Sequence, residues 1–383
     1  MQGARSLDAM LDALAGDFPD ARPLPKELFT DAEFFALDAA LFKESWLPVA
    51  HASELERPGS FVVVEIAGER VATVRGADLA LAAFFDGCLH RGTPLFSEAS
   101  GRIEDLVIVC PYHGLRYDLR GRADNSSCPS IRLGSRHALT PLRVEERLGF
   151  VFVCADERAP PIDESFGELP PWFEHASMFA LRLGKRWQHT VQCNWKLLVQ
   201  NFQESHHFAR VHPSLAAVTP AAQSTSLRFD GAFLGGTMKI ADGRATVSET
   251  GSREGRPFVA GVGDRRDVFD ALLVPGWLTS LQPDYFLSYR LLPRSPLETL
   301  VVADIYFHAS AFVGGFNPND VFSFWERTNA EDRAICERQQ RGLASPSFEP
   351  GPYATVEDGV YAFDRKLCDA YRRLSRERGD GCR

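Results

Sequence analysis

Two short loops, each with one cysteine and one histidine, constrain this chain more than any other feature. The stretch "CLHRG" contains Cys88 and His90, and "CPYHG" contains Cys110 and His113. A single cysteine is usually just a small core residue, but four metal-binding residue types in two matched loops are not expected by chance. The pattern therefore predicts one metal centre gripped by both loops.

Two kinds of centre fit this set of ligands. Zinc accepts two Cys and two His in a tetrahedral structural site. A [2Fe–2S] cluster of the Rieske type binds two thiolates on one iron and two imidazoles on the other. The spacing alone leaves both open. Because zinc fingers usually present both cysteines and then both histidines, one of each per loop favours the two-iron cluster.

The pattern of apolar residues divides the chain into three parts. Residues 1–45 suggest helical segments, and residues 46–156 contain short β-branched strands separated by turns with glycine. A Pro-rich stretch at 157–173 marks the boundary to a mixed domain at 157–383. We therefore expect an α+β fold in which a small all-β domain follows an N-terminal helical segment. Both Cys/His loops lie in the β domain.

Composition excludes several kinds of partner. The 383 residues carry a formal net charge of −9 and no basic run, which gives no electrostatic case for nucleic-acid binding. No apolar window reaches the length of a membrane span, and the first residues lack the pattern of a signal peptide. The 8 cysteines are scattered along the chain. We expect a protein of the reducing cytoplasm that binds no membrane.

A second group of metal-binding residue types lies in "NWKLLVQNFQESHHFARVHP", residues 194–213. Glu204 and His207 are three apart and would share one face of a helix. On a continuous helix His212 would point about 140° away from His207. Pro213 disfavours helical geometry at His212, so the chain is expected to turn there and the two imidazoles can converge. A ferrous site that binds O₂ would use both and one carboxylate from elsewhere.

Two helix starts are expected from capping residues. Asn194 is placed to cap a helix over "NWKLLVQNFQESHHF", which begins at this residue. Thr328 and Glu331 match a capping box at the start of "TNAEDRAICERQQRG", and Gly342 lies at its C-terminal end. The second helix supplies several acidic side chains.

The loops "CLHRG" and "CPYHG" resemble the two cluster loops of Rieske proteins. The resemblance implies that Cys88 and Cys110 bind one iron and that His90 and His113 bind the other. Three positions depart from the family pattern: Asp86 replaces a frequent Asn, Leu115 a frequent Trp, and Gln200 a frequent Glu in the second motif. None of these departures removes a ligand. They concern the groups that surround the ligands and tune the centre.

The second motif, with "ED-x-x-ICE-x-x-Q-x-GL-x-S" at 331–345, is similar to the iron site of Rieske non-haem iron oxygenase large subunits. The resemblance implies His207, His212 and Asp332 as ligands of a mononuclear Fe(II). Glu331 competes for the third place, but its capping box would give it a structural role. The family implies a catalytic domain with an antiparallel sheet flanked by helices, of the helix-grip or START-like type.

The resemblance also implies partners. Family members are homotrimers in which the cluster of one subunit lies beside the iron of its neighbour. Glu204 occupies the position of the acid that bridges a cluster histidine and an iron histidine. Electrons would come from NAD(P)H through a separate reductase, and O₂ would be the oxidant.

The motifs most resemble the branch that includes choline, glycine betaine and carnitine oxygenases. This implies hydroxylation of a C–H bond beside the nitrogen of a small quaternary or methylated amine, with demethylation as one outcome. Aromatic faces attract such cations, and five aromatic residues lie in strands that could line the pocket: Trp277, Tyr285, Phe286, Tyr289 and Phe307. The alternatives are a ring-hydroxylating dioxygenase, a non-catalytic Rieske electron-transfer protein and a zinc-stabilised binding protein.

Overall fold

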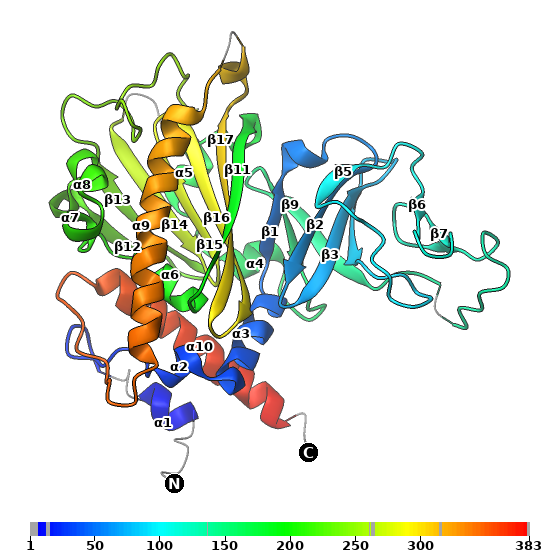
Figure 1. The fold of residues 1–383 in the computed structure, drawn as a ribbon, viewed down its shortest axis with the longest axis horizontal. Coiled ribbons are helices and arrows are strands. Elements are labelled where there is room, and N and C mark those ends of the chain that lie inside the picture. Colours follow the sequence, from blue (N-terminus) through cyan, green and yellow to red (C-terminus); the bar gives the residue numbers. More distant parts are fainter. Residues whose placement is uncertain are drawn as a thin grey trace. The chain divides into compact units, whose positions relative to one another are not determined.

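The protein forms two compact units, shown in Figure 1, and each is described by itself. The structure, a computed structural model, describes residues 7–12, 16–135, 137–259, 261, 265–313 and 316–380. The β unit contains residues 42–165 and 178–183, and the mixed unit contains the described parts of 1–41, 166–177 and 184–383. Of the predicted N-terminal helical segment, residues 1–6 and 13–15 lie outside the described residues.

In its described residues the β unit contains a seven-stranded and a three-stranded sheet, both antiparallel. The larger sheet has the order β1-β10-β9-β4-β3-β2-β5 and the smaller β6-β7-β8. The strands are β1 (Leu47–His51), β2 (Ser60–Ile66), β3 (Glu69–Arg75), β4 (Leu81–Phe85), β5 (Ser100–Arg102), β6 (Ile108–Val109), β7 (Arg116–Tyr117), β8 (Ala123–Asp124), β9 (Pro141–Arg147) and β10 (Phe150–Cys154). One apolar core joins β2, β3 and β4 to the Cys/His loops, so the loops stand on packed side chains.

The mixed unit is built on a second seven-stranded sheet within its described residues, with the order β11-β17-β16-β15-β14-β13-β12. The strands are β11 (Leu181–Val191), β12 (Thr225–Arg228), β13 (Phe233–Lys239), β14 (Asp267–Leu273), β15 (Trp277–Leu281), β16 (Tyr285–Ser295) and β17 (Glu298–His308). The pairs from β12 through β17 are antiparallel. Together with the helices below, this sheet confirms the expected α+β fold.

The helices of the described residues are α1 (Leu7–Leu11), α2 (Glu27–Thr30), α3 (Ala32–Glu44), α4 (Ile162–Phe166), α5 (Pro171–His175), α6 (Trp195–Phe202), α7 (Phe208–Val211), α8 (Pro213–Val218), α9 (Asn319–Leu343) and α10 (Asp358–Asp380). Short 3₁₀ helices cover Ala52–Leu55, Met178–Ala180, Ala221–Gln223 and Ala309–Phe312. Figure 1 shows the long helix α9, in orange, crossing one face of the sheet. Among the described residues, no helix combines the length and the apolarity needed to span a bilayer.

Strand alternation gives the large sheet of the mixed unit two different faces. On the helix face, Tyr289 of β16 donates a hydrogen bond to Asn329 of α9 (2.9 Å). On the opposite face, the ring of Trp277 stacks on Phe173 of α5 at 6.0 Å, and Phe286 also contacts Phe173. Of the five aromatic residues in strands that could line the pocket, Trp277 and Phe286 therefore leave the sheet on the face opposite Tyr289.

Helix α9 begins at Asn319, nine residues before Thr328, which was predicted to cap the start of this helix. Val321, Phe324 and Trp325 are buried and extend the apolar stripe of the helix toward its N-terminus. Thr328 therefore lies inside the helix, where its hydroxyl donates to the carbonyl of Phe324 (3.0 Å). The predicted capping box was wrong, and the acidic residues that follow it remain free for other contacts.

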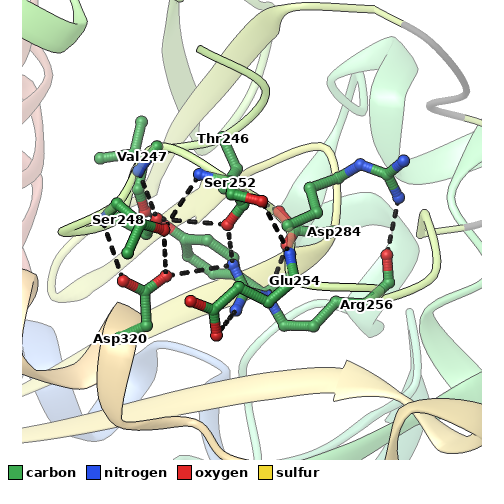
Figure 2. Close-up of polar contacts among 12 residues, drawn as sticks. Thr246, Val247, Ser248, Ser252, Glu254, Arg256, Asp284 and Asp320 are labelled. Atoms are coloured by element: carbon green, nitrogen blue, oxygen red, sulfur yellow. Dashed lines mark hydrogen bonds and ion pairs between the residues drawn. The ribbon is translucent and has the colours of Figure 1, made fainter.

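A buried polar network holds the start of α9 beside the loop that joins β13 to β14, as Figure 2 shows. Arg256 Nε donates to Asp284 Oδ2 at 2.7 Å, and its Nη2 lies 3.5 Å from Asp320 of α9. The hydroxyl of Thr246 donates to the other oxygen of Asp284. Because the two charges at the centre are buried and paired, the network fixes the loop, the β15–β16 turn and α9 in one arrangement.

A second buried ion pair joins α3 to α6. Lys196 Nζ donates to Asp38 Oδ2 at 2.6 Å and to the carbonyl of Leu28 at 2.9 Å. Asp38 also accepts a hydrogen bond from Tyr371 of α10. Both charged side chains are almost completely shielded from solvent, so neither can be left unpaired without a large cost.

We expect Lys196→Met to lower the free energy of unfolding by about 3–5 kcal/mol, because it leaves the charge of Asp38 buried and unpaired. Lys43→Met removes the partner of Glu69 in an exposed pair whose side chains keep 42% and 45% of their surface open, and should cost at most about 1 kcal/mol. Urea unfolding followed by circular dichroism measures both. Equal midpoints for the two variants would contradict this account of the pair.

Candidate metal centres

The two Cys/His loops have the same backbone frame. In each loop the cysteine carbonyl accepts from the glycine four residues on, Gly92 at 2.8 Å and Gly114 at 3.0 Å. In each loop the backbone N–H of the cysteine donates to a carbonyl five residues further on. Cys88 donates to Thr93 and Cys110 donates to Leu115, both at 2.9 Å. Both glycines have φ near +75°, a conformation that costs a side chain-bearing residue energy. The repeated Cys-to-Gly spacing in the sequence is therefore the signature of two matched turns.

The four donors of these loops are separated by depth. Cys88 and Cys110 are 3% and 2% exposed, whereas His90 and His113 lie at the surface. The Nδ1 atoms of the two imidazoles lie 3.2 Å apart. Two buried sulfurs beneath two converging imidazoles fit a cluster in which one iron takes the thiolates and the other the nitrogens. The predicted residues are thus brought together in the arrangement that a Rieske cluster requires.

A tyrosine that sequence reasoning missed contacts one of the cysteines. Tyr117, fully buried on β7, places its hydroxyl 3.2 Å from Cys88 Sγ and accepts from the N–H of Leu89 at 3.0 Å. Because the oxygen already accepts one hydrogen bond, its own proton is free to point at the sulfur. Burial, followed by the contact with Cys88, raises the pKa of Tyr117. The hydroxyl therefore stays protonated and remains a donor.

Two of the departures from the family pattern have structural roles. Asp86 is buried; its Oδ1 accepts from the N–H of Leu95 at 2.7 Å and its Oδ2 accepts from Arg70 at 2.8 and 2.9 Å. Asp86 thus ties the first cluster loop to β3. Leu115 is 1% exposed and belongs to the core beneath the loops.

We expect Tyr117→Phe to lower the midpoint potential of the cluster by some tens of millivolts. A hydrogen bond to sulfur favours the more negative, reduced cluster, and losing about 1 kcal/mol of that preference lowers the potential of a one-electron centre accordingly. Redox titration followed by circular dichroism or electron paramagnetic resonance measures the shift. Tyr112→Phe, which removes an exposed hydroxyl from the second loop, is the control, and an equal shift in both variants would refute the role of Tyr117.

The segment between α6 and α8 is more broken than the sequence suggests. Asn194 caps α6 as predicted, since its side chain accepts from the N–H of Lys196 (3.1 Å). The helix ends at Phe202, however, so Glu204 and His207 do not share a continuous helix. A local turn joins them instead: Glu204 accepts from the backbone N–H of His207 at 3.1 Å and contacts its Nδ1 at 2.6 Å.

The chain turns at His212, as the following proline predicts. His212 has φ −123° and ψ 69° between α7 and α8, and Pro213 is the first residue of α8. The turn brings the ring of His212 to 5.0 Å from the ring of His207. Without this break the two imidazoles would leave the chain in different directions.

Helix α9 supplies two carboxylates to these histidines. Asp332 Oδ1 lies 2.7 Å from His212 Nε2 and 3.6 Å from His207 Nε2. One ligand atom from each of these three residues lies within 4.8 Å of the other two. Glu331 contacts the other nitrogen of His212, Nδ1, at 2.7 Å. Asp332 and the two imidazoles can therefore bind one metal ion together. Glu331 contacts the far nitrogen of His212 and fixes the orientation of that ring.

Opposite charges dominate the electrostatics of this group. Burial alone would lower the pKa of His207, but hydrogen bonds to Asp332 and Glu204 outweigh it and raise the pKa to about 9. Burial would raise the pKa of Asp332, and its contacts with the two histidines lower it instead. A cation at this point is favoured by the surrounding acids, and a metal ion would displace the protons on binding.

The donor set fits a mononuclear ferrous ion. Two imidazole nitrogens and one carboxylate oxygen are the ligands of non-haem iron sites that leave positions open for O₂ and substrate. Asp332 faces Nε2 of each histidine. Glu204 contacts the other nitrogen, Nδ1, of His207, and Glu331 contacts Nδ1 of His212. Such contacts fix the ring orientation and strengthen the histidine as a ligand.

Two cavities lie on the helix face of the sheet. A small one of about 70 Å³ is lined by Asp332, Tyr289, Asn201 and apolar residues of the sheet. A larger one of about 570 Å³ is lined by Glu204, Phe208, Asp270 and residues of β13. Phe202, the last residue of α6, lines both. Candidate ligands and open volume therefore lie together in the mixed unit.

A Rieske-type loop pair and a two-histidine, one-carboxylate group in one chain define a Rieske non-haem iron oxygenase. Residues 178–373 match the family of the ring hydroxylating alpha subunit (catalytic domain), and residues 45–133 match the Rieske [2Fe–2S] domain. The chain belongs to the ring-hydroxylating alpha subunit family.

The chain is similar to relatives that cover between about half and nearly all of it. The glycine betaine monooxygenase oxygenase subunit of Chromohalobacter salexigens is 28% identical over 94% of this chain and 88% of its own length. The carnitine monooxygenase oxygenase subunit of Escherichia coli K12 is 34% identical over 51% of this chain and 54% of its own length. A solved quaternary ammonium Rieske monooxygenase is 25% identical, covers 94% of this chain and 98% of its own, and superposes with a TM-score of 0.79.

Membership of the family decides between the alternatives that the sequence left open. The chain is an oxidoreductase with a Rieske [2Fe–2S] domain and a mononuclear iron catalytic domain. The interpretations as a zinc-stabilised binding protein and as a non-catalytic electron-transfer protein were wrong, because the second unit is the catalytic domain of an oxygenase.

We expect Asp332→Ala to lose the mononuclear iron and to keep the cluster, which reduces the content from about three irons to about two with two sulfides per chain. Glu331→Ala keeps all three ligands and should weaken iron binding about 10- to 100-fold, because only an orienting contact is lost. Iron and sulfide analysis after dialysis against a chelator distinguishes the two. Full loss of iron in Glu331→Ala with retention in Asp332→Ala would reverse the assignment.

Proposed function

We propose that the chain is the terminal oxygenase component that hydroxylates a C–H bond next to the nitrogen of a small quaternary or methylated amine. The reaction consumes the substrate, O₂, two electrons and two protons, and gives the hydroxylated product and water. Where the hydroxyl is placed on an N-methyl group, the product breaks down to the demethylated amine and formaldehyde.

The observation that carries this proposal is the match with the glycine betaine oxygenase subunit over 94% of the chain. The solved quaternary ammonium monooxygenase extends the likeness to the whole fold. Both units of the present chain contribute, because the Cys/His loops and the His207–His212–Asp332 group are both formed. Bound iron at the second group supplies positions for O₂, and the cluster supplies electrons one at a time.

A ring-hydroxylating dioxygenase is the second candidate. The benzene 1,2-dioxygenase alpha subunit of Pseudomonas putida is 26% identical over 55% of this chain and 47% of its own length. This match covers less of the chain than the match with the glycine betaine oxygenase subunit, so an aromatic substrate is the weaker proposal. A panel of arenes and betaines therefore belongs in one assay.

The electron path is proposed to run between subunits of a homotrimer, with a separate NAD(P)H-dependent reductase as the source. The solved relative is described in connection with inter-subunit electron transfer. Glu204 holds Nδ1 of His207 and lines the larger cavity. A carboxylate in this place can accept an N–H from a cluster histidine of a neighbouring subunit as well.

We also propose that the three predicted parts, residues 1–45, 46–156 and 157–383, are the functional divisions of the chain. The compact units change near residues 41 and 165, and the family matches cover 45–133 and 178–373. The cysteines of the described residues are all free, which supports a reducing compartment such as the cytoplasm.

The substrate is tested by incubating the purified protein with a compatible reductase, NADH and a panel of betaines and arenes. We expect O₂ uptake that depends on a methylated amine, with formaldehyde released where demethylation occurs. Coupled uptake with arenes alone would defeat the choice of substrate.

We expect Glu204→Ala to retain both iron centres and to lose at least about 100-fold in turnover, because the link between the imidazoles is removed. The reductase should still reduce the cluster, and stopped-flow absorbance should show that the reduced cluster no longer reoxidises with substrate and O₂. Glu331→Ala removes a histidine contact elsewhere in the site and is expected to bind iron more weakly, so it is the matched control once both variants are loaded to equal iron content. Normal cluster reoxidation in Glu204→Ala would rule out the bridge.

A further inference from the structure

Asp270, which is half-buried, differs from the fully buried acidic side chains of the mixed unit. Asp38, Asp284 and Asp304 each contact a cationic side chain, and Asp364 accepts hydrogen bonds from two neutral donors. The Oδ1 oxygen of Asp270 is buried and has no hydrogen-bond partner among the described residues. Asp270 is therefore an acid whose counterpart the described chain does not supply.

This arrangement is costly unless something else completes it. Burial raises the pKa of Asp270 to about 7, and a hydrogen bond from Ser280 opposes the rise. Moving a carboxylate away from water without a partner disfavours its charged form. A cation placed beside Asp270 would offset that cost and favour the ionised state.

A cavity lies against the helix face of the sheet next to this carboxyl group. Asp270 of β14 lies between Gly236 of β13 and Ser280 of β15 in the strand register. Gly236 has no side chain to cover the helix face at this point. The cavity of about 570 Å³ opens there, with Asp270, Gly236, Phe202 and Phe208 among its lining residues. Two further acidic residues, Glu204 and Asp358, also line this cavity. A small molecule in it would therefore meet negative charge together with two aromatic rings.

The same carboxyl group shares a face of the sheet with Tyr289, which contacts α9. Burial raises the pKa of Tyr289, and the charges of both Asp332 and Asp270 raise it further. Phe202 lines this cavity and also the smaller cavity that Asp332 lines. A molecule held by Asp270 would therefore lie on the side of the sheet where oxidation is proposed to occur.

We propose that Asp270 supplies the negative charge that recognises the methylated ammonium group of the substrate. The inference rests on the proposed function and names the residue that selects for a cation. A quaternary nitrogen has no N–H to donate, so it requires nearby negative charge and apolar or aromatic walls rather than an aligned acceptor. A half-buried carboxyl group without a cationic partner among the described residues, in a cavity that Phe202 and Phe208 also line, meets this requirement.

Tetramethylammonium tests the proposal without turnover. Isothermal titration of the iron-loaded wild-type protein should show binding, and Asp270→Asn should weaken it at least about tenfold, because the charge is lost while the shape is kept. Asp364→Asn is the control: it neutralises a fully buried carboxyl group that has its own donors, and should bind like wild type. No binding to wild type, equal binding to Asp270→Asn, or equal loss in both variants would overturn the proposal.

An isostere that lacks the ammonium charge separates recognition of that charge from recognition of shape. In 3,3-dimethylbutanoate a carbon replaces the nitrogen of glycine betaine. Wild type should bind glycine betaine more tightly than this analogue, Asp270→Asn should lose the preference, and Asp270→Glu should regain part of it. A preference unchanged in Asp270→Asn would contradict the assignment. If no methylated amine supports O₂ uptake, the proposed function fails, while the tetramethylammonium titration still decides the role of Asp270.

Discussion

The contact between His212 and the two carboxylates of α9 is the interaction on which the catalytic unit depends. Glu331 holds Nδ1 and Asp332 lies against Nε2, both at 2.7 Å. The partners are about 120 residues apart in the chain, so they meet only if α9 is placed correctly on the sheet. The buried pair of Arg256 and Asp284 fixes the start of that helix, and an error there would propagate to the ligands.

Both candidate centres follow the same physical plan. Backbone turns present the cysteine and histidine ligands, and helix α9 presents Asp332. A buried layer lies beneath each set: the apolar core under Cys88 and Cys110, and the sheet under Asp332. Around each ligand set, a polar side chain orients a donor that would otherwise rotate, as Tyr117 does for a sulfur and Glu204 for an imidazole. Ligands supported in this way keep one geometry while a metal changes its charge.

Several features of the fold and sites could be predicted because they are local. The matched spacing of cysteine and glycine predicts two equivalent turns, and Pro213 predicts the break that lets His207 and His212 converge. Short β-branched runs predicted the strands of the β unit. The start of α9 could not be placed from Thr328, because burial of the preceding aromatic residues against the sheet outweighs a local capping pattern. The role of Glu331 was misjudged for the same reason.

What the sequence by itself determined is the inventory: two cysteine–histidine turns, a broken histidine segment and an acidic helix, each set by spacing within a few residues. Only the tertiary structure decided which side chains face one another. It placed Tyr289 and Trp277 on different faces of the sheet and set Asp332 and Glu331 against different nitrogens of His212. It also left Oδ1 of Asp270 without a hydrogen-bond partner among the described residues. These choices depend on strand register and helix placement, which are set by packing between residues far apart in the chain and leave no local pattern to read.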